Sequence, residues 1–338
     1  MFNLSKNRSL LVFLVSKISS IRKPVAKELS LFEPYFKSIL KSKVPLLGII
    51  TNYIYRRKGK QLRPLLVFLS AGLKGNINQS TYVAASMVEL LHTATLIHDD
   101  VVDEAYERRG SFSINALWRS KVAVLVGDFL LSKGLLIAID TNEFELLRIM
   151  SNAVKEMSEG ELLQIERSRK MNIDEETYLD IIQKKTATLI SACVVNGARS
   201  AGANKEELER IANYGKNLGI AFQIKDDIFD YQAKGLLGKP IGNDIKENKL
   251  TLPIIHALSN VSKSERSRVL KLFKKAKRSN SAIEEIINFA QQNGGIDYAV
   301  RTMNEYKNMA KQALYSFPDS EYRQSLELLA DFIVERKS

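Results

Sequence analysis

Apolar residues recur every three to four positions along most of the chain, which is the spacing of one face of an α-helix. The seven prolines reinforce this pattern, because none lies between Pro64 and Pro240. Proline removes a backbone donor and clashes with the preceding turn, so a long proline-free stretch favours uninterrupted helices. We do not find the alternation with turn dipeptides that is typical of paired strands. The sequence therefore predicts an all-α fold.

The same pattern, together with the turn residues, gives approximate helix boundaries. Helices are expected to begin near Val25, Leu46, Gln61, Gln79, Ser113, Phe144, Asp174 and Lys205, with shorter ones after Leu250. The strongest loop signal is "GLLGKPIGND" at 235–244, and "NGG" at 293–295 is another break. No low-complexity linker divides the chain, so we predict a basic extension (1–22) followed by one all-α domain (23–338).

Two predicted helices carry the same acidic pattern, DDxxD. The first is in "LIHDDVVDEAYERRG", with Asp99, Asp100 and Asp103, and the second is in "FQIKDDIFDY", with Asp226, Asp227 and Asp230. Residues four apart lie on one helix face, where like charges cost about 0.2–0.5 kcal/mol per pair. One such motif alone is most simply a solvated acidic helix end. Two, each after an apolar run, call for a cation to offset the repulsion.

Carboxylate oxygens suit Mg²⁺, which keeps several waters and is completed by substrate phosphates. Two acidic helices facing a common cavity would therefore clamp a Mg²⁺-bound diphosphate. The flanking runs "LLHTATLI" and "LGIAFQI" are apolar, so the space below the clamp is expected to be apolar. This combination predicts an amphiphilic substrate with a diphosphate head and a hydrocarbon tail.

A second anion site is predicted in "RRKGKQLRP" at 56–64. Gly59 breaks one helix and Pro64 lies in the first turn of the next, with Lys60 and Arg63 beside its start. Cations at a helix N-terminus form a ready site for a diphosphate. Arginines 108 and 109 follow the first acidic motif and can serve either anion site, because Arg binds phosphate through two parallel hydrogen bonds.

Composition limits the alternatives. One cysteine, Cys193, excludes an intrachain disulfide, and with only three histidines the chain lacks the ligands of a zinc site. Residues 1–60 carry 13 Lys/Arg against two Glu, so they hold nearly all of the net charge of +12. This uneven placement does not fit a nucleic-acid-binding face. It is most simply solvated helix surface, with weak attraction to anionic lipid as the alternative.

The apolar runs do not predict a membrane span. The run Leu10–Val15 is too short, and the apolar segment 121–139 is interrupted by Asp128 and Lys133, so it is expected to be a buried helix. We therefore expect a cytoplasmic protein whose first residues are peripheral or weakly adherent to membranes.

Six blocks, in order, carry a family resemblance: "GKQLRP", "ELLHTATLIHDDVVDEAYERRG", "LVGDFLL", "QKKTATLISA", "GIAFQIKDDIFDY" and "GKPIGNDIKENKLTLP". The chain resembles the trans-isoprenyl diphosphate synthases, or polyprenyl synthetases. The resemblance implies an all-α fold around a deep central cavity, usually in a homodimer. It also implies Mg²⁺-dependent condensation of isopentenyl diphosphate with an allylic diphosphate, farnesyl or geranylgeranyl.

The resemblance also implies residue roles. The six aspartates would bind Mg²⁺ and the allylic diphosphate, with about three ions brought together by that group. Other implied roles fall to Arg108, Lys239 and Lys249 for the allylic diphosphate, to Lys60, Arg63, His92 and Arg109 for isopentenyl diphosphate, and to Lys185, Thr186 and Gln223 beside the allylic cation. Two positions depart from the family pattern, Gln61 and Lys225. The other histidines, His98 and His256, are expected to be structural.

Product length is expected to depend on the residues one turn before Asp99. Ala94 and Thr95 are small where short-chain members carry an aromatic, so a growing chain can pass. The floor would then lie on the next helix, around 135–139, and we expect a product near octaprenyl for a quinone side chain. Close helix packing is the alternative explanation of these small residues.

Other interpretations remain open at this point. They are a shorter-chain synthase, a non-catalytic subunit of a heteromeric synthase, a terpene cyclase and an acidic Ca²⁺-binding protein. The chain lacks the glycine-containing loop of an EF-hand, which disfavours a Ca²⁺-binding protein. It keeps every implied acidic and basic residue, which disfavours a non-catalytic subunit.

Overall fold

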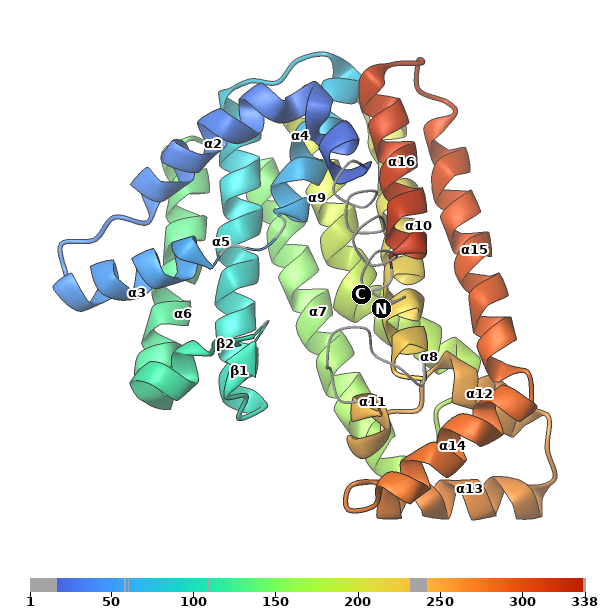
Figure 1. Ribbon diagram of the computed structural model, residues 1–338. Helices are drawn as coiled ribbons and strands as arrows, with labels where there is room; N and C mark the ends of the chain where they lie inside the picture. Colours follow the sequence, from blue (N-terminus) through green and yellow to red (C-terminus); the bar gives the residue numbers. More distant parts are fainter. Residues whose placement is uncertain (1–16, 58, 60, 109, 232–241, 337–338) are drawn as a thin grey trace, which may run out of the picture.

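The computed structural model describes residues 17–57, 59, 61–108, 110–231 and 242–336 (Figure 1). Its elements, in chain order, are η1 (Lys23–Val25), α2 (Ala26–Ile39), α3 (Pro45–Arg56), α4 (Leu62–Lys74), α5 (Gln79–Val102), β1 (Glu107–Arg108), β2 (Ser111–Phe112), α6 (Ile114–Asp140), α7 (Phe144–Lys170), α8 (Glu175–Ile182), η2 (Gln183–Ala187), α9 (Thr188–Ser200), α10 (Lys205–Phe229), α11 (Asn243–Lys246), α12 (Leu252–Ser259), α13 (Lys263–Ala276), α14 (Asn280–Gln292), α15 (Gly295–Leu314) and α16 (Glu321–Glu335). The all-α prediction is confirmed.

Helix boundaries agree closely with the sequence pattern, because capping residues mark them. Asn78 and Asn204 each form a capping box, which satisfies otherwise unpaired N–H groups at the starts of α5 and α10. α4 begins at Leu62, with Pro64 in its first turn as expected. The predicted extension, 1–22, lies mostly outside the described residues.

The structure adds one short strand pair that the sequence pattern does not indicate. β1 and β2 pair antiparallel directly after the first acidic motif. Each strand has two residues, too few for alternation to be visible in the sequence. Tyr53 of α3 donates a hydrogen bond to the carbonyl of Phe112 at 2.6 Å, which fixes this hairpin against α3.

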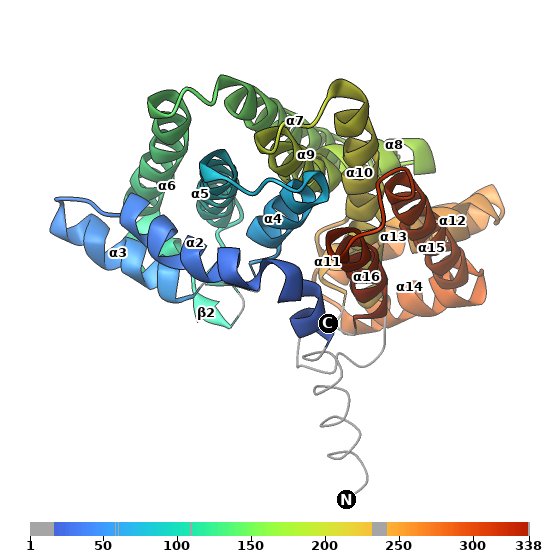
Figure 2. The ribbon, with the colours of Figure 1, turned by 90° about the horizontal axis from the view of Figure 1, so that it is seen from above.

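Helix α5 is the centre of one half of the molecule. Figure 2 shows it surrounded by α4, α6, α7 and α9, with α2 beside it. Its buried residues, which include Met87, Leu90 and Leu91, belong to a hydrophobic core shared with these neighbours. A second core, built around Ile224 and Ile228 of α10, packs against α12, α14 and α15. The first half of α10, with Ile211, Tyr214 and Leu218, shares the core of α5, whereas its second half, which carries the acidic motif, belongs to the second core.

Helix α6 is only half buried. Its inner face packs on α5, where Gly134 lies against Leu91. Its outer face exposes Leu117, Val124, Leu125, Leu136 and Ile139. An 18-residue window of α6 has mean hydropathy 2.1 and is 33% buried. By length and composition alone, α6 is the one described helix that could cross a membrane. A core helix of a soluble protein can meet the same two criteria. The predicted buried helix is thus buried on one face.

Candidate active site

Both acidic motifs end a helix. α5 ends at Val102 with Asp103 as its C-cap, and α10 ends at Phe229 with Asp230 as its C-cap. The C-terminal end of a helix carries partial negative charge, so carboxylates there are electrostatically unfavourable without a cation. In Figure 1, the β1–β2 hairpin that follows α5 and α11, which comes after α10, both lie toward the lower end of the molecule. The motifs therefore face the same end.

The first motif is largely open to solvent. Asp99 and Asp103 are exposed, whereas Asp100 is 4% exposed. The chain beyond it is held by backbone contacts: the Ser113 hydroxyl donates to the carbonyl of Ala105 at 2.6 Å. The backbone of this helix end is therefore fixed, while two of its carboxylates point outward.

The second motif is surrounded by protein donors. Tyr178 donates to Asp227 Oδ2 at 2.6 Å and Gln223 Nε2 donates to Asp227 Oδ1 at 2.9 Å. Arg336 Nη2 lies 2.6 Å from Asp226 Oδ1.

The third aspartate of this motif contacts the chain after the loop. Asp230 accepts the backbone N–H groups of Asn243 and Asp244 at 2.9 and 3.0 Å. These bonds tie the end of α10 to the start of α11, and they bring Asp244 next to the motif.

Burial makes these carboxylates poor anions without a cation. Desolvation raises the pKa of Asp227 to about 8, and the charge of Asp244 adds to the shift. Desolvation also raises the pKa of Asp244 to about 6, with Asp230 as the second cause, and raises that of Asp230. A divalent cation beside these carboxylates would favour their ionised forms and so oppose the three shifts.

The described residues do not form a complete metal centre by themselves. Among them, no group of three or more Asp, Glu, His or Cys side chains is close enough to hold an ion. This agrees with the coordination of Mg²⁺, which commonly takes one or two carboxylates and completes its shell with water and substrate phosphates.

A π-helical turn presents the next site residues. Lys185 and Thr186 lie in η2, and such turns are frequent at functional sites because they shift side chains out of helical register. Two glycines allow η2 to approach its neighbours. A Cβ on Gly160 of α7 would lie 2.8 Å from Lys184 Cβ, and one on Gly219 of α10 would lie 2.7 Å from Ala187 Cβ.

These elements enclose a small cavity of about 80 Å³. Five predicted site residues help to line it: Lys185, Thr186, Gln223, Asp227 and Lys249. The Thr186 hydroxyl donates to Gln223 Oε1 at 2.7 Å, and Gln223 in turn donates to Asp227. Residues from η2 and α10 thus form one polar network, and Lys249, from the segment before α12, lines the same cavity.

The two lysines of this cavity already have acidic partners. Lys185 Nζ lies 2.5 Å from Glu161 and 3.1 Å from Gln164 Oε1. Lys249 lies 2.5 Å from Glu247 and 4.0 Å from Asp244. Burial opposes the charge of Lys249, but the hydrogen bond and charge of Glu247 leave its pKa raised, so it stays a cation.

The predicted isopentenyl diphosphate site is only partly described. Arg63 lies in the first turn of α4, and His92 lies on α5 with 8% exposure. Lys60, Arg109 and Lys239 lie outside the described residues, as does the side chain of Arg108, whose backbone is in β1. These assignments stay predictions.

The remaining histidines make structural contacts. His98 packs against Gly127 and contacts Asp128 at 3.5 Å, and His256 stacks on Tyr298 with ring centroids 3.9 Å apart.

The residues expected to set product length separate into two groups. Ala94 is 1% exposed, and the Thr95 hydroxyl donates to the carbonyl of His92 at 2.8 Å. Of the predicted floor segment, Ala138 is buried, whereas Leu136 and Ile139 are 51% and 48% exposed on the outer face of α6. Within one chain, these two side chains point away from α5.

Sequence reasoning missed three residues at the second motif. Asp244 lies in the quoted block "GKPIGNDIKENKLTLP", but it stands outside DDxxD, and Tyr178 lies 49 residues before its partner. Arg336 is 110 residues from Asp226. Only Asp244, an acidic residue shortly after the motif, offered a signal in the sequence.

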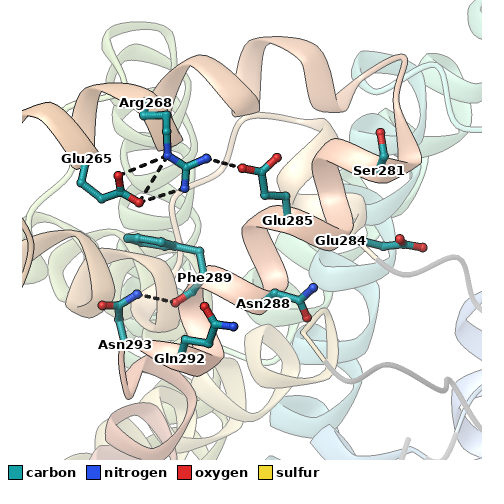
Figure 3. A pocket seen from close by; sticks show the side chains of 9 residues that line it. All are labelled: Glu265, Arg268, Ser281, Glu284, Glu285, Asn288, Phe289, Gln292 and Asn293. Atoms are coloured by element: carbon teal, nitrogen blue, oxygen red, sulfur yellow. Dashed lines mark hydrogen bonds and ion pairs between the residues drawn. The ribbon is translucent and has the colours of Figure 1, made fainter.

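A roomier pocket of about 490 Å³ lies elsewhere, between α13 and α14 (Figure 3). There Arg268 pairs with Glu265 at 2.9 Å and also with Glu285. Because this arginine is already held by its own carboxylates, and no predicted site residue lines the pocket, we do not assign it to the active site.

Comparison with known proteins agrees with this geometry. Residues 44–290 match the family model described as polyprenyl synthetase. All-trans-nonaprenyl-diphosphate synthase (geranyl-diphosphate specific) of Rhodobacter capsulatus is 36% identical, over 93% of this chain and 96% of that protein. Octaprenyl diphosphate synthase of Escherichia coli (strain K12) is 34% identical, over 88% of this chain and 92% of that protein.

A solved structure shows the same architecture. Polyprenyl synthase from Caulobacter crescentus CB15, complexed with calcium and isoprenyl diphosphate, superposes with a TM-score of 0.87. It is 34% identical and covers 95% of this chain and 98% of that one. From the family match, the relatives and the shared fold, we conclude that the chain belongs to the polyprenyl synthetase family and is a prenyl transferase enzyme.

Proposed function

We propose that this enzyme condenses isopentenyl diphosphate with an allylic diphosphate, farnesyl or geranylgeranyl, to give an all-trans polyprenyl diphosphate near octaprenyl. The observation that carries the proposal is the meeting of Lys185, Thr186, Gln223 and Lys249 with Asp227 around one cavity. The Thr186 hydroxyl and the Gln223 amide can face an allylic cation, and the two lysines can face the departing diphosphate, so the set suits ionisation of an allylic diphosphate.

We assign the six aspartates of the two motifs as the residues that hold Mg²⁺. Their oxygen chemistry fits this ion, and the raised pKa of Asp227 is expected where a buried carboxylate lacks its cation. Bound Mg²⁺ would neutralise the diphosphate and make it a better leaving group. We leave the number of ions at the expected three, held together by the diphosphate.

Side chains of the protein would bind the two diphosphate groups and orient the substrates. Lys185 and Lys249 offer fixed positive charge to the departing diphosphate, as would Arg108 and Lys239. Arg63 and His92, with Lys60 and Arg109, would hold isopentenyl diphosphate so that its double bond lies against the allylic carbon. The departing diphosphate would then accept the proton lost from the product.

The Thr186–Gln223 pair has a defined direction. Because Asp227 is approached by Gln223 Nε2, the Gln223 carbonyl oxygen turns toward Thr186, whose hydroxyl proton it accepts. The lone pairs of the Thr186 oxygen are therefore directed away from Gln223. Such preset dipoles would stabilise an allylic cation without reorganisation during the reaction.

The length assignment rests on Ala94 and Thr95, which leave no aromatic barrier before the first motif, and on the long-chain names of the two relatives. A shorter geranylgeranyl product is the second candidate. It would require a floor on another element, because the outward-facing Leu136 and Ile139 cannot line one within one chain.

The exposed apolar face of α6 supports a homodimer. Leu117, Val124, Leu125 and Leu136 would be covered by a second copy, as expected of a large apolar patch. Sedimentation should then give a dimer, and Leu125→Glu should release monomers; a wild-type monomer would contradict this.

We further propose a cytoplasmic enzyme with weak peripheral membrane contact through residues 1–22. Their basic charge would attract anionic lipid, where a long polyprenyl product partitions. Removal of residues 1–20 should weaken binding to vesicles that contain phosphatidylserine, and unchanged binding would remove this part of the proposal.

Product analysis tests the main proposal. Purified enzyme, Mg²⁺, farnesyl diphosphate and labelled isopentenyl diphosphate should give a ladder that ends near octaprenyl by mass spectrometry, and Asp99→Ala should abolish it. A product of geranylgeranyl length would keep the reaction and exclude the open path at Ala94 and Thr95. No incorporation by folded protein would favour a non-catalytic subunit or a cyclase.

A further inference from the structure

The last residue that the structure describes, Arg336, reaches the second aspartate motif. Its Nη2 atom donates to Asp226 Oδ1 at 2.6 Å and to the carbonyl of Phe222 at 3.3 Å. Its Nε atom donates to the carbonyl of Ile333 at 3.2 Å. The C-terminal end of α16 is thereby joined to the last turns of α10.

Aromatic contacts hold the same guanidinium. It lies 4.1 Å from the ring centroid of Phe222 and 5.6 Å from that of Phe229. Arg is suited to this arrangement, because its planar group stacks on a ring while its N–H groups bind in the plane. Most of these contacts do not involve Asp226, so the guanidinium is anchored independently of the carboxylate.

The solvent exposure of the two side chains also indicates that Arg336 is the anchored partner. The Arg336 side chain is 15% exposed and that of Asp226 is 40% exposed. The arginine is therefore the fixed partner, and the aspartate is the one that solvent and ligand can reach. A carboxylate in the last turn of α10 is disfavoured by the negative end of the helix dipole, which would turn it outward without a cationic partner.

We propose that Arg336 is a positioning residue for the second metal-binding motif, holding one oxygen of Asp226 so that the carboxylate is preset for Mg²⁺ carrying a diphosphate. The inference rests on the proposed function, because it needs Asp226 to be a metal ligand. Residues that orient a metal ligand commonly contribute about 10–100-fold to metal affinity or activity.

A plain charge effect predicts the opposite sign. A guanidinium near a metal site repels the incoming cation, so its loss should strengthen Mg²⁺ binding if charge alone matters. If Arg336 positions Asp226, its loss should weaken binding. For Mg²⁺ alone, the sign of the change separates the two explanations. For the anionic Mg²⁺-diphosphate complex, a lost positive charge also weakens binding, and Arg336→Lys separates them because it keeps the charge.

The test measures binding of inorganic diphosphate with Mg²⁺ to the full-length protein by calorimetry. Arg336→Gln should weaken binding about tenfold, and Arg336→Lys should weaken it similarly, because an ammonium keeps the charge but loses the stacked planar fork. The Mg²⁺ concentration for half-maximal activity should rise, with kcat recovering at saturating Mg²⁺.

Two variants serve as matched controls. Lys225→Gln removes a positive charge whose Nζ lies 5.0 Å from the Phe229 centroid, so it tests charge without the Asp226 contact and should not weaken binding. Arg323→Gln removes an arginine of α16 that pairs with Glu327 at 2.9 Å, away from the motif, and reports on helix stability alone.

The outcomes separate this inference from the assignment beneath it. Asp226→Ala should lose binding; if it does not, the metal assignment fails and the role of Arg336 fails with it. If Asp226→Ala loses binding but both Arg336 variants bind as well as wild type or better, only the positioning role is overturned. A lower Tm without any change in the Mg²⁺ requirement would also overturn it, since it indicates a structural role. Arg336→Lys keeps the test valid if Arg336→Gln fails to fold.

Discussion

The first aspartate motif ends α5 with Asp99 and Asp103 exposed, whereas the second ends α10 with protein donors on all three carboxylates. Both have the same DDxxD spacing and both lie against the unfavourable end of a helix dipole. In the second motif, Tyr178, Gln223, Arg336 and two backbone N–H groups bind the carboxylates.

This difference indicates two ways of preparing a cation site. In the second motif, folding places each carboxylate, so metal binding there should require little rearrangement. The first motif presents Asp99 and Asp103 to solvent, where a metal-bound diphosphate would arrange them. We therefore expect the second motif to affect both stability and activity, and the first to affect activity alone.

The largest expected effect compares Asp99→Ala with Asp227→Ala at pH 6. Each should reduce kcat/KM by more than about 100-fold, because even supporting residues of metal sites contribute about 10–100-fold. At this pH Asp227 is mostly protonated, so its removal relieves little charge repulsion but leaves the Tyr178 and Gln223 groups without a partner. We expect Asp227→Ala to lose about 1–3 kcal/mol of unfolding free energy.

Urea denaturation without Mg²⁺ measures this stability difference. Asp99→Ala should stay within about 0.5 kcal/mol of wild type, as is usual for exposed positions. Equal destabilisation by both substitutions would show that the two motifs do not differ in the way described.

A smaller effect concerns pH. The pKa of Asp227 rises from 3.8 to about 8 on folding, so its favourable contribution is complete below pH 3.8 and is lost as the pH rises through 8. Asp244, with a pKa of about 6, acts in the same direction. Without Mg²⁺, Tm should therefore fall between pH 6 and pH 9.

Scanning calorimetry across this pH range checks the effect. Asp227→Asn cannot ionise and should flatten the profile, while Mg²⁺ with inorganic diphosphate should reduce the loss in wild type. Asp99→Asn should keep the wild-type slope. A wild-type Tm that is constant from pH 6 to pH 9 would argue against the burial of Asp227 as a neutral acid.

The smallest effect compares the third aspartates. Asp230 accepts two backbone N–H groups, and an amide in its place can keep only one of them as an acceptor, so Asp230→Asn should cost about 1 kcal/mol. Asp103→Asn should change stability by less than about 0.5 kcal/mol, because its side chain is exposed. Metal-free urea midpoints measure both, and a larger loss for Asp103→Asn would reverse the comparison.

The sequence by itself determined the helical architecture and the chemistry of the motifs. Helical periodicity, proline placement and capping residues such as Asn78 and Asn204 are local signals, so the starts of α4, α5, α7 and α10 were predictable within about two residues. The paired DDxxD motifs indicated oxygen-ligand metal chemistry, because the types and spacing of the residues are enough for that inference.

Only the tertiary structure decided which residues meet. Tyr178 and Arg336 come from α8 and the end of α16, and packing alone brings them to Asp227 and Asp226. Gln223, by contrast, contacts Asp227 from one turn earlier on the same helix. It also left one face of α6 exposed, although the apolar sequence of that helix predicts burial. Local patterns report the preference of a segment, whereas burial, raised pKa values and contacts between distant residues depend on neighbours that no local pattern specifies.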